Sequence, residues 1–387
     1  MKNKVLIIFK YPHAWNNPVI AKFSNYYETE FLYVSNFKDK NFTEIVQHIN
    51  NLIIEKEINI VVFDVDYFKF INLFFIQKIN CKKKILWTGD DFELHKMNSI
   101  TASTCDLVLT TCPLSALKYK EKGYEAYLTH GENGKINDHK DKKKEIDVLF
   151  FGALTPNRNE ILNYISSKGI NLKNAGHDEG VTGLPENELI ELISKSKIIL
   201  NLSKTRTDSV SDFSSEKVYK FYYQTKGRII IAGMNGVLCV SEYSPFQDLL
   251  FQEEVPSFFT KEECVKILNQ LLTNEELFLK LSNKFTKKIR DMFEDKNSFK
   301  LINEAIEKQS NRKVKLIKIP HWYLRIAAKQ ILLRNIKISN LNKTILQFKL
   351  IFEMLKNTNL LIKFLVIFES ILNTLWYSIT LTVKSKK

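Results

Sequence analysis

The chain has 387 residues, 44% of them hydrophobic and 26% charged, so it is long enough to bury the cores of two domains. Twelve glycines and eight prolines exclude collagen-like and most low-complexity classes, and five scattered cysteines argue against a disulfide scaffold or a structural zinc site. The formal net charge is +14, but residues 310–387 hold fifteen Lys and Arg and only two acids, a balance of +13. The rest of the chain is therefore close to neutral.

Short apolar runs alternate with segments of helical length through residues 1–134. The first run, residues 5–9, is shorter than the apolar segment of a secretory signal, so we expect a buried strand there and no signal peptide. Continuous apolar strands separated by helices indicate a parallel sheet covered on both faces. Strands are predicted at 5–9, 30–34, 58–63, 84–87, 107–110 and 125–128, with helices that include 42–56 and 113–122.

Residues 135–145 are polar and rich in charge, which predicts a linker, and the alternation then restarts over 146–309. The fold class expected is α/β: two Rossmann-like domains facing a cleft, followed by a basic, mainly helical extension over 310–387. Ligands of such sheets bind at the carboxyl ends of the strands. The second domain is predicted to have strands at 146–151, 170–174, 197–200 and 228–232, and helices near 157–168, 186–195, 214–224 and 261–308.

The loop after the first strand of the second domain is the first candidate binding segment. Gly152 allows a ligand to approach the backbone, and Arg158 falls in the first turn of the next helix, where a phosphate would bind. A plain strand-turn-helix with a solvated arginine is the alternative. A second glycine-containing loop, around Gly176, is a further candidate for contact with a bound donor.

A long polar segment, residues 201–216, follows the strand predicted at 197–200. Ser215 and Glu216 open the next helix, and a carboxylate there can accept hydrogen bonds from paired ribose hydroxyls. Lys204 and Arg206 are suited to a diphosphate. The alternative is that Glu216 only caps its helix.

Acid–base candidates lie at strand ends of the first domain and beside the linker. Asp90 and Asp91 follow a predicted strand, and either can serve as a general base for an acceptor hydroxyl. His130 lies where a ligand would bridge both domains. Asp64 and Asp66 have the spacing of a metal-binding pair that holds a diphosphate, but this spacing is short and common, and a polar strand end is the favoured explanation.

Taken in order, several segments resemble GT-B glycosyltransferases of group 1. The likeness is closest to the bacterial spore-coat-maturation-type branch and covers roughly residues 80–305. In the second domain it rests on residues 147–158 (DVLFFGALTPNR), 195–201 (KSKIILN), 214–216 and 227–232 (GRIIIA). In the first domain it rests on residues 90–91, 105–111 (CDLVLTT), 118–123 and 130–133.

The resemblance implies a nucleotide-sugar donor in the second domain, with Glu216 on the ribose, Gly152 near the diphosphate and Arg158 on a phosphate. Retaining members often carry a sugar-contacting Glu eight residues before the ribose Glu, and Asp208 stands at that position here. Helix N-termini and basic side chains can stabilise the leaving diphosphate without a metal. A hexosyltransferase that needs neither cofactor nor metal is therefore expected.

The C-terminal segment 310–387 places basic residues among Leu, Ile and Phe, with Trp and Tyr near both ends. This pattern is typical of helices that lie on an anionic membrane surface, and it does not favour nucleic acid. Residues 360–383 are long enough to span a bilayer, but Glu369 near their middle makes an interfacial position more favourable. A helical appendage packed on the body or on a partner chain is the alternative.

The sequence thus predicts a bacterial glycosyltransferase of polysaccharide biosynthesis, cytoplasmic and peripheral on the inner face of the cell membrane. It would move a sugar from a nucleotide-sugar donor to a surface glycan or lipid-linked acceptor. The alternative from a different class is a non-catalytic nucleotide- or carbohydrate-binding module that tethers a glycan-assembly complex to the membrane.

Overall fold

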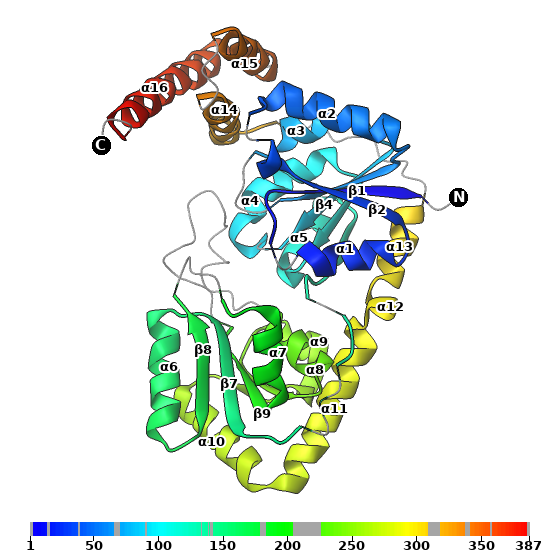
Figure 1. The fold of residues 1–387 in the computed structure, drawn as a ribbon, viewed down its shortest axis with the longest axis vertical. Helices are drawn as coiled ribbons and strands as arrows, with labels where there is room; N and C mark the ends of the chain where they lie inside the picture. The colour runs from blue at the N-terminus through cyan, green and yellow to red at the C-terminus, as the bar shows by residue number, and fades with distance from the viewer. Residues whose placement is uncertain are drawn as a thin grey trace.

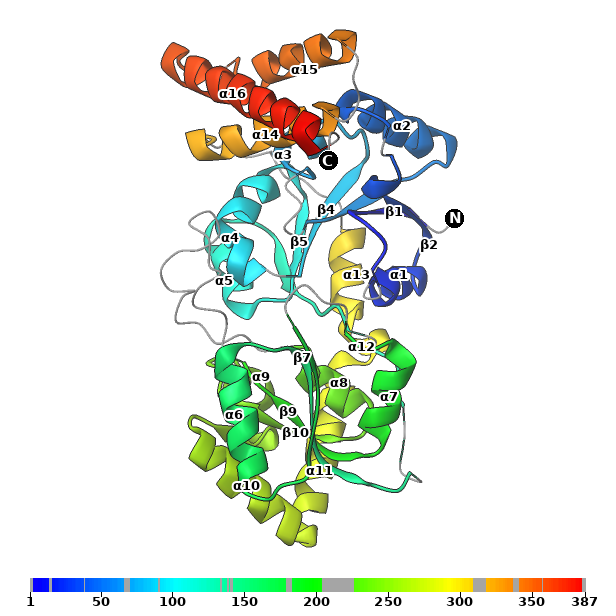
Figure 2. The same ribbon diagram turned by 60° about the vertical axis from the view of Figure 1, so that its left-hand side comes forward.

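Two α/β domains and a helical C-terminal unit follow one another along the long axis of the molecule (Figure 1). The C-terminal unit contacts the first domain, at the end opposite the second domain (Figures 1 and 2). The computed structural model describes residues 3–13, 16–37, 39–65, 70–89, 91–132, 134–137, 139, 142–178, 183–203, 226–308, 318–336, 341–356 and 358–384.

The first domain is a six-stranded parallel sheet with the strand order β2-β1-β3-β4-β5-β6. The strands are β1 (Lys4–Phe9), β2 (Glu28–Tyr33), β3 (Ile60–Asp64), β4 (Lys83–Thr88), β5 (Leu107–Thr110) and β6 (Ala126–Leu128). Helices cover both faces: α1 (Asn16–Ser24), α2 (Phe42–Glu55), α3 (Leu73–Gln77), α4 (Asp91–Thr101) and α5 (Pro113–Glu121). The start of α2 is set locally, because Asn41 and Glu44 form a reciprocal capping box.

The second domain has a five-stranded parallel sheet with the order β11-β10-β9-β7-β8. Its strands are β7 (Ile146–Ala153), β8 (Leu172–His177), β9 (Ser196–Asn201), β10 (Leu238–Glu242) and β11 (Ser257–Phe258). Its helices are α6 (Pro156–Ser167), α7 (Glu186–Ser194), α8 (Arg228–Met234), α9 (Gln247–Phe251), α10 (Lys261–Thr273) and α11 (Glu275–Phe293). The expected α/β class with two doubly wound domains is confirmed.

One predicted strand is wrong. Residues 228–232 were expected to be extended, but they form the start of α8, and the next strand is β10. A short apolar run does not distinguish a buried helix from a buried strand by periodicity. Here Ile229 and Ala232 are both fully buried, so the helix has little polar surface to reveal its period. The helix predicted at 214–224 lies outside the described residues.

After α11 the chain returns to the first domain through α12 (Asp295–Ser298) and α13 (Lys300–Glu307). Phe299 and Ile302 join the same buried cluster as Phe23 and Trp87 of the first domain. The Tyr27 hydroxyl donates a hydrogen bond to Asn303 Oδ1 at 2.6 Å. The first domain therefore takes part of its core from residues that the sequence pattern assigned to the second.

The C-terminal unit consists of α14 (His321–Ile336), α15 (Leu341–Met354) and α16 (Leu360–Lys384). Leu324 and Ala328 of α14 pack in one cluster with Leu73 of α3 and Val366 of α16. At α14 the structure therefore shows the alternative that the sequence left open, a helical appendage packed on the body. None of the helices that the structure describes is long and apolar enough to cross a membrane.

Tyr323→Phe is expected to loosen α14 from the first domain. The buried Tyr323 hydroxyl accepts the backbone N–H of Leu73 at 2.9 Å and lies 2.8 Å from Thr101 Oγ1. Without it the buried N–H loses its acceptor, which should lower the free energy of unfolding by about 1–3 kcal/mol in urea titrations. Tyr11→Phe, at a 40% exposed ring, is the matched control. Equal midpoints for the two variants would contradict this account of the contact.

Candidate functional site

A cleft of about 1020 Å³, open to solvent, lies between the two domains. Its first wall is made by residues at the carboxyl ends of β1, β3, β4, β5 and β6. Phe9 and Asp64 are at the carboxyl ends of the adjacent strands β1 and β3. The chain continues from β1 to β2 on one side of the sheet and from β3 to β4 on the other, and ligands of doubly wound folds bind at this switch point. The remaining residues of this wall are Asn16, Val19, Trp87, Gly89, Thr111, Pro113 and the segment 128–132.

The second wall of the cleft comes from α8, α9 and the end of α11. Gly227, just before α8, faces Glu132 of the other wall. A Cβ atom at position 227 would lie only 1.6 Å from Glu132 Oε1, so any other residue would displace this carboxylate. The absence of a side chain at Gly227 thus allows the two domains to meet at Glu132.

His130 and Glu132 form a close pair of titratable groups on the first wall. The His130 ring is buried, its Nδ1 lies 3.8 Å from Glu132 Oε2, and its Nε2 lies 3.4 Å from Ser298 Oγ. Lys22 Nζ donates a hydrogen bond to the Glu132 carbonyl oxygen. Burial, and then the charge of Lys22, lower the pKa of His130 well below its usual value of 6.5.

Burial also raises the pKa of Glu132, although the Lys22 charge opposes the shift. The first wall therefore holds a neutral imidazole beside a carboxyl group whose proton affinity is increased. A pair of this kind can remove the proton from a hydroxyl group while that hydroxyl reacts, and can later return it.

Two buried guanidinium groups lie at the carboxyl ends of β7 and β9, the switch point of the second sheet. Arg228 Nε donates to the Phe151 carbonyl at 2.6 Å, and its Nη1 donates to Asn201 Oδ1 at 2.9 Å. Arg158 donates to the carbonyl oxygens of Ala153 and Leu202. This end of the sheet therefore carries two positive charges inside the protein.

Gly152 makes room for one of these guanidinium groups. It has a φ of +113°, which an L side chain rarely adopts, and a Cβ there would lie 2.7 Å from Arg228 Nη2. Burial, followed by repulsion from Arg158, lowers the pKa of Arg228 to about 9. Such a destabilised cation pair favours a bound anion. Gly152 and Arg158 line neither of the two pockets described, and in this structure the group close to Gly152 is Arg228.

Gly176 lies apart from the interdomain cleft. It lines a pocket of about 1060 Å³ beside the edge strand β8 and α7. A Cβ at this position would lie 2.6 Å from Leu154 Cδ2, so packing against Leu154 explains the glycine. Because Gly176 pairs with Gly152 in the register of β7 and β8, its contact with a donor stays a prediction.

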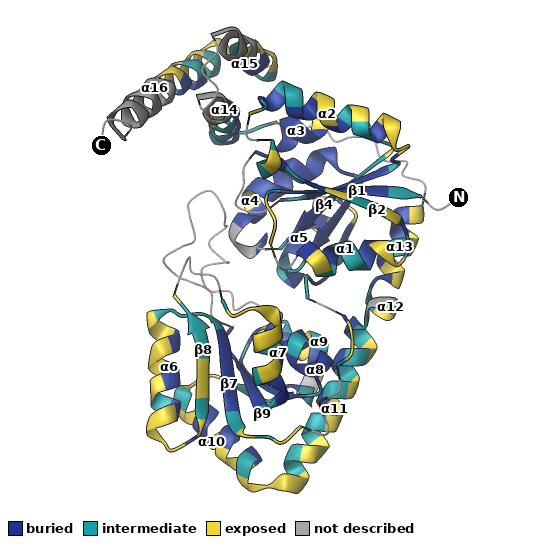
Figure 3. Cartoon of the chain, viewed as in Figure 1, coloured by how far each residue is buried: buried dark blue, intermediate teal, exposed yellow. Residues whose placement is uncertain are grey.

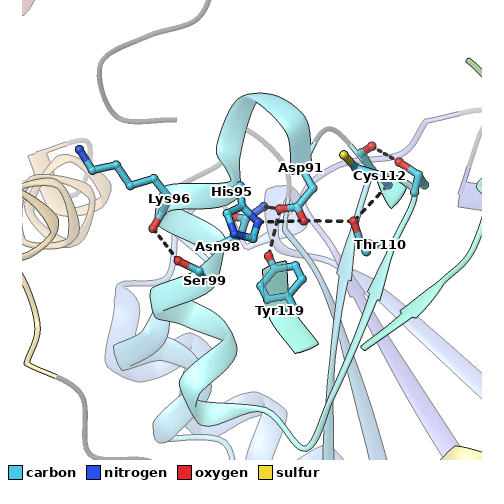
Figure 4. A network of polar contacts seen from close by, with 10 residues as sticks. Asp91, His95, Lys96, Asn98, Ser99, Thr110, Cys112 and Tyr119 are labelled. Carbon is cyan, nitrogen blue, oxygen red and sulfur yellow. Dashed lines mark hydrogen bonds and ion pairs between the residues drawn. The ribbon is translucent and has the colours of Figure 1, made fainter. Parts of the chain in front are cut away.

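Asp91 is the centre of a buried polar network rather than a group on the cleft wall (Figure 4). Asn98 Nδ2 and the Tyr119 hydroxyl donate to its Oδ1 at 2.9 and 3.0 Å, and Thr110 Oγ1 donates to its Oδ2 at 3.0 Å. His95 Nδ1 lies 3.7 Å from Oδ2. These contacts occupy the carboxylate, so its position does not support the role of a base for an acceptor hydroxyl.

The ionisation of Asp91 follows from the same contacts. Burial by itself would raise its pKa, but interactions with His95, Asn98 and Tyr119 outweigh burial and lower it. Asp91 is therefore a stable buried anion. Just before α4, the Gly89 carbonyl oxygen accepts a hydrogen bond from Thr111 Oγ1.

The other predicted site residues lie outside the described residues. They are Asp66, Asp90, Lys204, Arg206, Asp208, Ser215 and Glu216. Among the residues that the structure describes, no group of three or more His, Cys, Asp or Glu side chains is arranged to hold a metal ion.

Sequence reasoning missed Lys22, Glu132 and Arg228 as site residues. Lys22 and Arg228 each interrupt an apolar stretch, residues 19–23 and 227–232, and both are buried. A lone charge inside a segment expected to be buried was the available signal, because such a charge needs a specific set of partners. Glu132 gave no comparable signal in the sequence.

Comparison with known proteins agrees with this architecture. Residues 142–298 match the family model described as glycosyl transferase-like. A glycosyltransferase from Rickettsia africae has a TM-score of 0.51 and 11% identity, covering 79% of this chain and 99% of that chain. Anabaena HepE in complex with UDP-glucose has a TM-score of 0.51 and 10% identity, covering 78% of this chain and 99% of that chain. No curated protein matches the sequence.

The fold is therefore that of two-domain GT-B glycosyltransferases, with a glycosyltransferase-like domain over residues 142–298. Proteins of this fold include one whose structure contains UDP-glucose.

Asp91→Asn is expected to lower the free energy of unfolding by about 1–3 kcal/mol, because an amide cannot accept all the hydrogen bonds that the buried carboxylate accepts. Urea titration measures this, with Glu191→Gln, at an exposed carboxylate, as the control. Turnover per folded molecule should stay close to wild type. A loss of about a hundredfold or more would instead make Asp91 a general base.

His130→Gln is expected to change how stability depends on pH. Because the folded pKa of His130 is depressed, the unfolded chain takes up the proton first as the pH falls through 6.5. Stability that is complete above pH 6.5 should therefore be lost below it, by up to about 1.4 kcal/mol per pH unit. Urea midpoints across this range should fall less steeply for His130→Gln than for His13→Gln, at an exposed histidine. Identical slopes would contradict a buried neutral imidazole.

Proposed function

We propose that this protein is a glycosyltransferase that binds a nucleotide-sugar donor between its domains and transfers the sugar to an acceptor held by the first domain. The observation that carries the proposal is the pair of buried guanidinium groups, Arg158 and Arg228, at the switch point of a glycosyltransferase-like domain. A nucleotide sugar leaves a diphosphate on transfer, and fixed positive charge near that group lowers the barrier.

The segment 204–225 is proposed to complete the donor site. In the sequence it follows β9, and Leu202, two residues before it, accepts a hydrogen bond from Arg158. Lys204 and Arg206 are proposed on the diphosphate, and Ser215 and Glu216 on the ribose, with Asp208 near the sugar. A hexose donor and chemistry that needs no metal fit this set of groups.

His130 and Glu132 are proposed as the groups that move the acceptor proton. Both line the cleft, and the lowered pKa of His130 keeps its imidazole uncharged at neutral pH, with one ring nitrogen able to accept a proton. Closure of the domains around the donor would exclude water, which otherwise hydrolyses it. Asp90 remains a proposed alternative base.

The acceptor is proposed to be a surface glycan or a lipid-linked saccharide of bacterial polysaccharide biosynthesis, at the cytoplasmic face of the membrane. The balance of +13 over residues 310–387 supports this location, because an anionic membrane surface attracts such a segment.

The proposal is tested by titrating the full-length protein with UDP-, GDP- and dTDP-sugars by calorimetry, and by measuring release of the nucleoside diphosphate. We expect one donor class to bind and turn over, and EDTA to leave the rate unchanged. Loss of activity in EDTA would indicate a metal site at Asp64 and Asp66. Tight binding without turnover would favour the non-catalytic binding module.

Glu216→Ala is expected to raise the donor Kd by about tenfold or more, because the ribose hydroxyls lose a charged hydrogen-bond acceptor. Calorimetric titration with the donor that binds wild type measures the change. Glu160→Ala removes an exposed carboxylate on α6 and serves as the control. Unchanged affinity in Glu216→Ala would remove this residue from the donor site.

A further inference from the structure

The last helix, α16, carries an apolar stripe that nothing in the described chain covers. Leu361, Phe364, Leu365, Phe368 and Leu372 are each at least 40% exposed, and we call this set the outer face of α16. They recur at intervals of three and four residues, so they lie on one side of the helix. Figure 3 shows exposed positions along the described part of α16.

The opposite side of α16 holds the helix on the protein. Val366 and Ser370 are buried, and Val366 packs in the cluster that contains Leu324 and Ala328 of α14. Glu369 forms an ion pair with Arg325 of α14. The orientation of α16 is therefore set by α14, and its outer face is directed away from that helix.

The outer face is continuous and aromatic. The rings of Phe364 and Phe368 are stacked, with centroids 5.8 Å apart and an interplanar angle of 9°. Leu361 and Phe364 are 66% and 64% exposed. Contiguous exposed apolar surface of this kind marks a site of contact with a membrane or another protein.

Charge decides between these partners. Phe352 of α15 is 54% exposed, the exposed Lys349 lies one turn before it, and the exposed Lys356 follows the end of the helix. The whole segment 310–387 has a balance of +13, so two copies brought together through it would repel each other. An anionic lipid surface would be attracted to the same charge while taking up the apolar face.

We propose that the outer face of α16 inserts into the headgroup–acyl boundary of an anionic bilayer, with Lys349 and Lys356 against the lipid phosphates. Membrane binding itself is independent of the proposed function, and only the inference about the acceptor rests on it. Because α14–α16 lie at the end of the molecule opposite the second domain, the first domain would then lie between the membrane and the donor-binding domain (Figures 1 and 2). The acceptor class favoured by this orientation is a lipid-linked saccharide.

The experiment is co-sedimentation of the full-length protein with phosphatidylcholine vesicles that contain phosphatidylglycerol, and with vesicles of phosphatidylcholine alone. Wild type should bind the anionic vesicles at least about tenfold more tightly than the neutral ones. The double variant Phe364→Asp/Phe368→Asp should lose about tenfold or more of its affinity for the anionic vesicles. Ile54→Asp and Phe259→Asp are matched controls, at side chains that are 78% and 70% exposed elsewhere, and should bind like wild type.

The charge contribution has its own variant. Lys349→Glu/Lys356→Glu should weaken binding to anionic vesicles by about tenfold and leave binding to neutral vesicles unchanged. Far-UV circular dichroism and urea midpoints check that each variant is folded.

Two results would overturn the proposal. One is equal vesicle binding by wild type and the folded Phe364→Asp/Phe368→Asp variant. The other is a wild-type dimer in sedimentation velocity that this variant dissolves, which would assign the outer face to a second copy of the chain. All vesicle measurements are made without nucleotide sugar, so failure of the proposed donor chemistry leaves their result unaffected.

Discussion

The hydrogen bonds of the buried Arg228 guanidinium group position α8 on the second sheet, and the cleft wall that α8 forms depends on them. Burying this cation requires hydrogen-bond acceptors, which are supplied by the Phe151 carbonyl of β7 and by Asn201 at the end of β9. The Phe150 ring, whose centroid lies 5.1 Å from the guanidinium carbon, adds a cation–π contact. Arg228 therefore ties the start of α8 to the two central strands. It also requires glycine at position 152.

The position of α8 in turn sets the relation between the domains. Gly227 precedes Arg228 and leaves space for the Glu132 carboxylate of the first domain. Glu132 lies beside the buried His130, and Lys22 from α1 donates to the Glu132 backbone. The cleft thus has a neutral imidazole beside a carboxyl group of raised pKa in one wall, and positive charge is buried in the domain that forms the other. This division suits a reaction in which an acceptor hydroxyl loses its proton and bonds to a sugar while an anionic diphosphate departs from that sugar.

The chain also joins its parts by returning twice to the first domain. Phe299 and Ile302 complete the core around β1, and Tyr323 fixes α14 over α3 and α4. Two parts of the C-terminal segment therefore differ: one packs on the first domain and the other is exposed. α14 packs on the first domain, whereas the outer face of α16 remains on the surface. The excess of positive charge belongs to this C-terminal segment, and the rest of the chain is nearly neutral.

The sequence by itself determined the two doubly wound domains, because runs such as residues 5–9 and 146–151 are apolar enough to specify buried parallel strands. It also located the histidine of the cleft and the basic segment. Only the tertiary structure decided that residues 228–232 are helical, that Arg228 approaches Gly152, that Asp91 is turned into the core and that Glu132 meets Gly227. Each of these depends on side chains far apart in the sequence, and a buried charge is defined by partners that no local pattern contains.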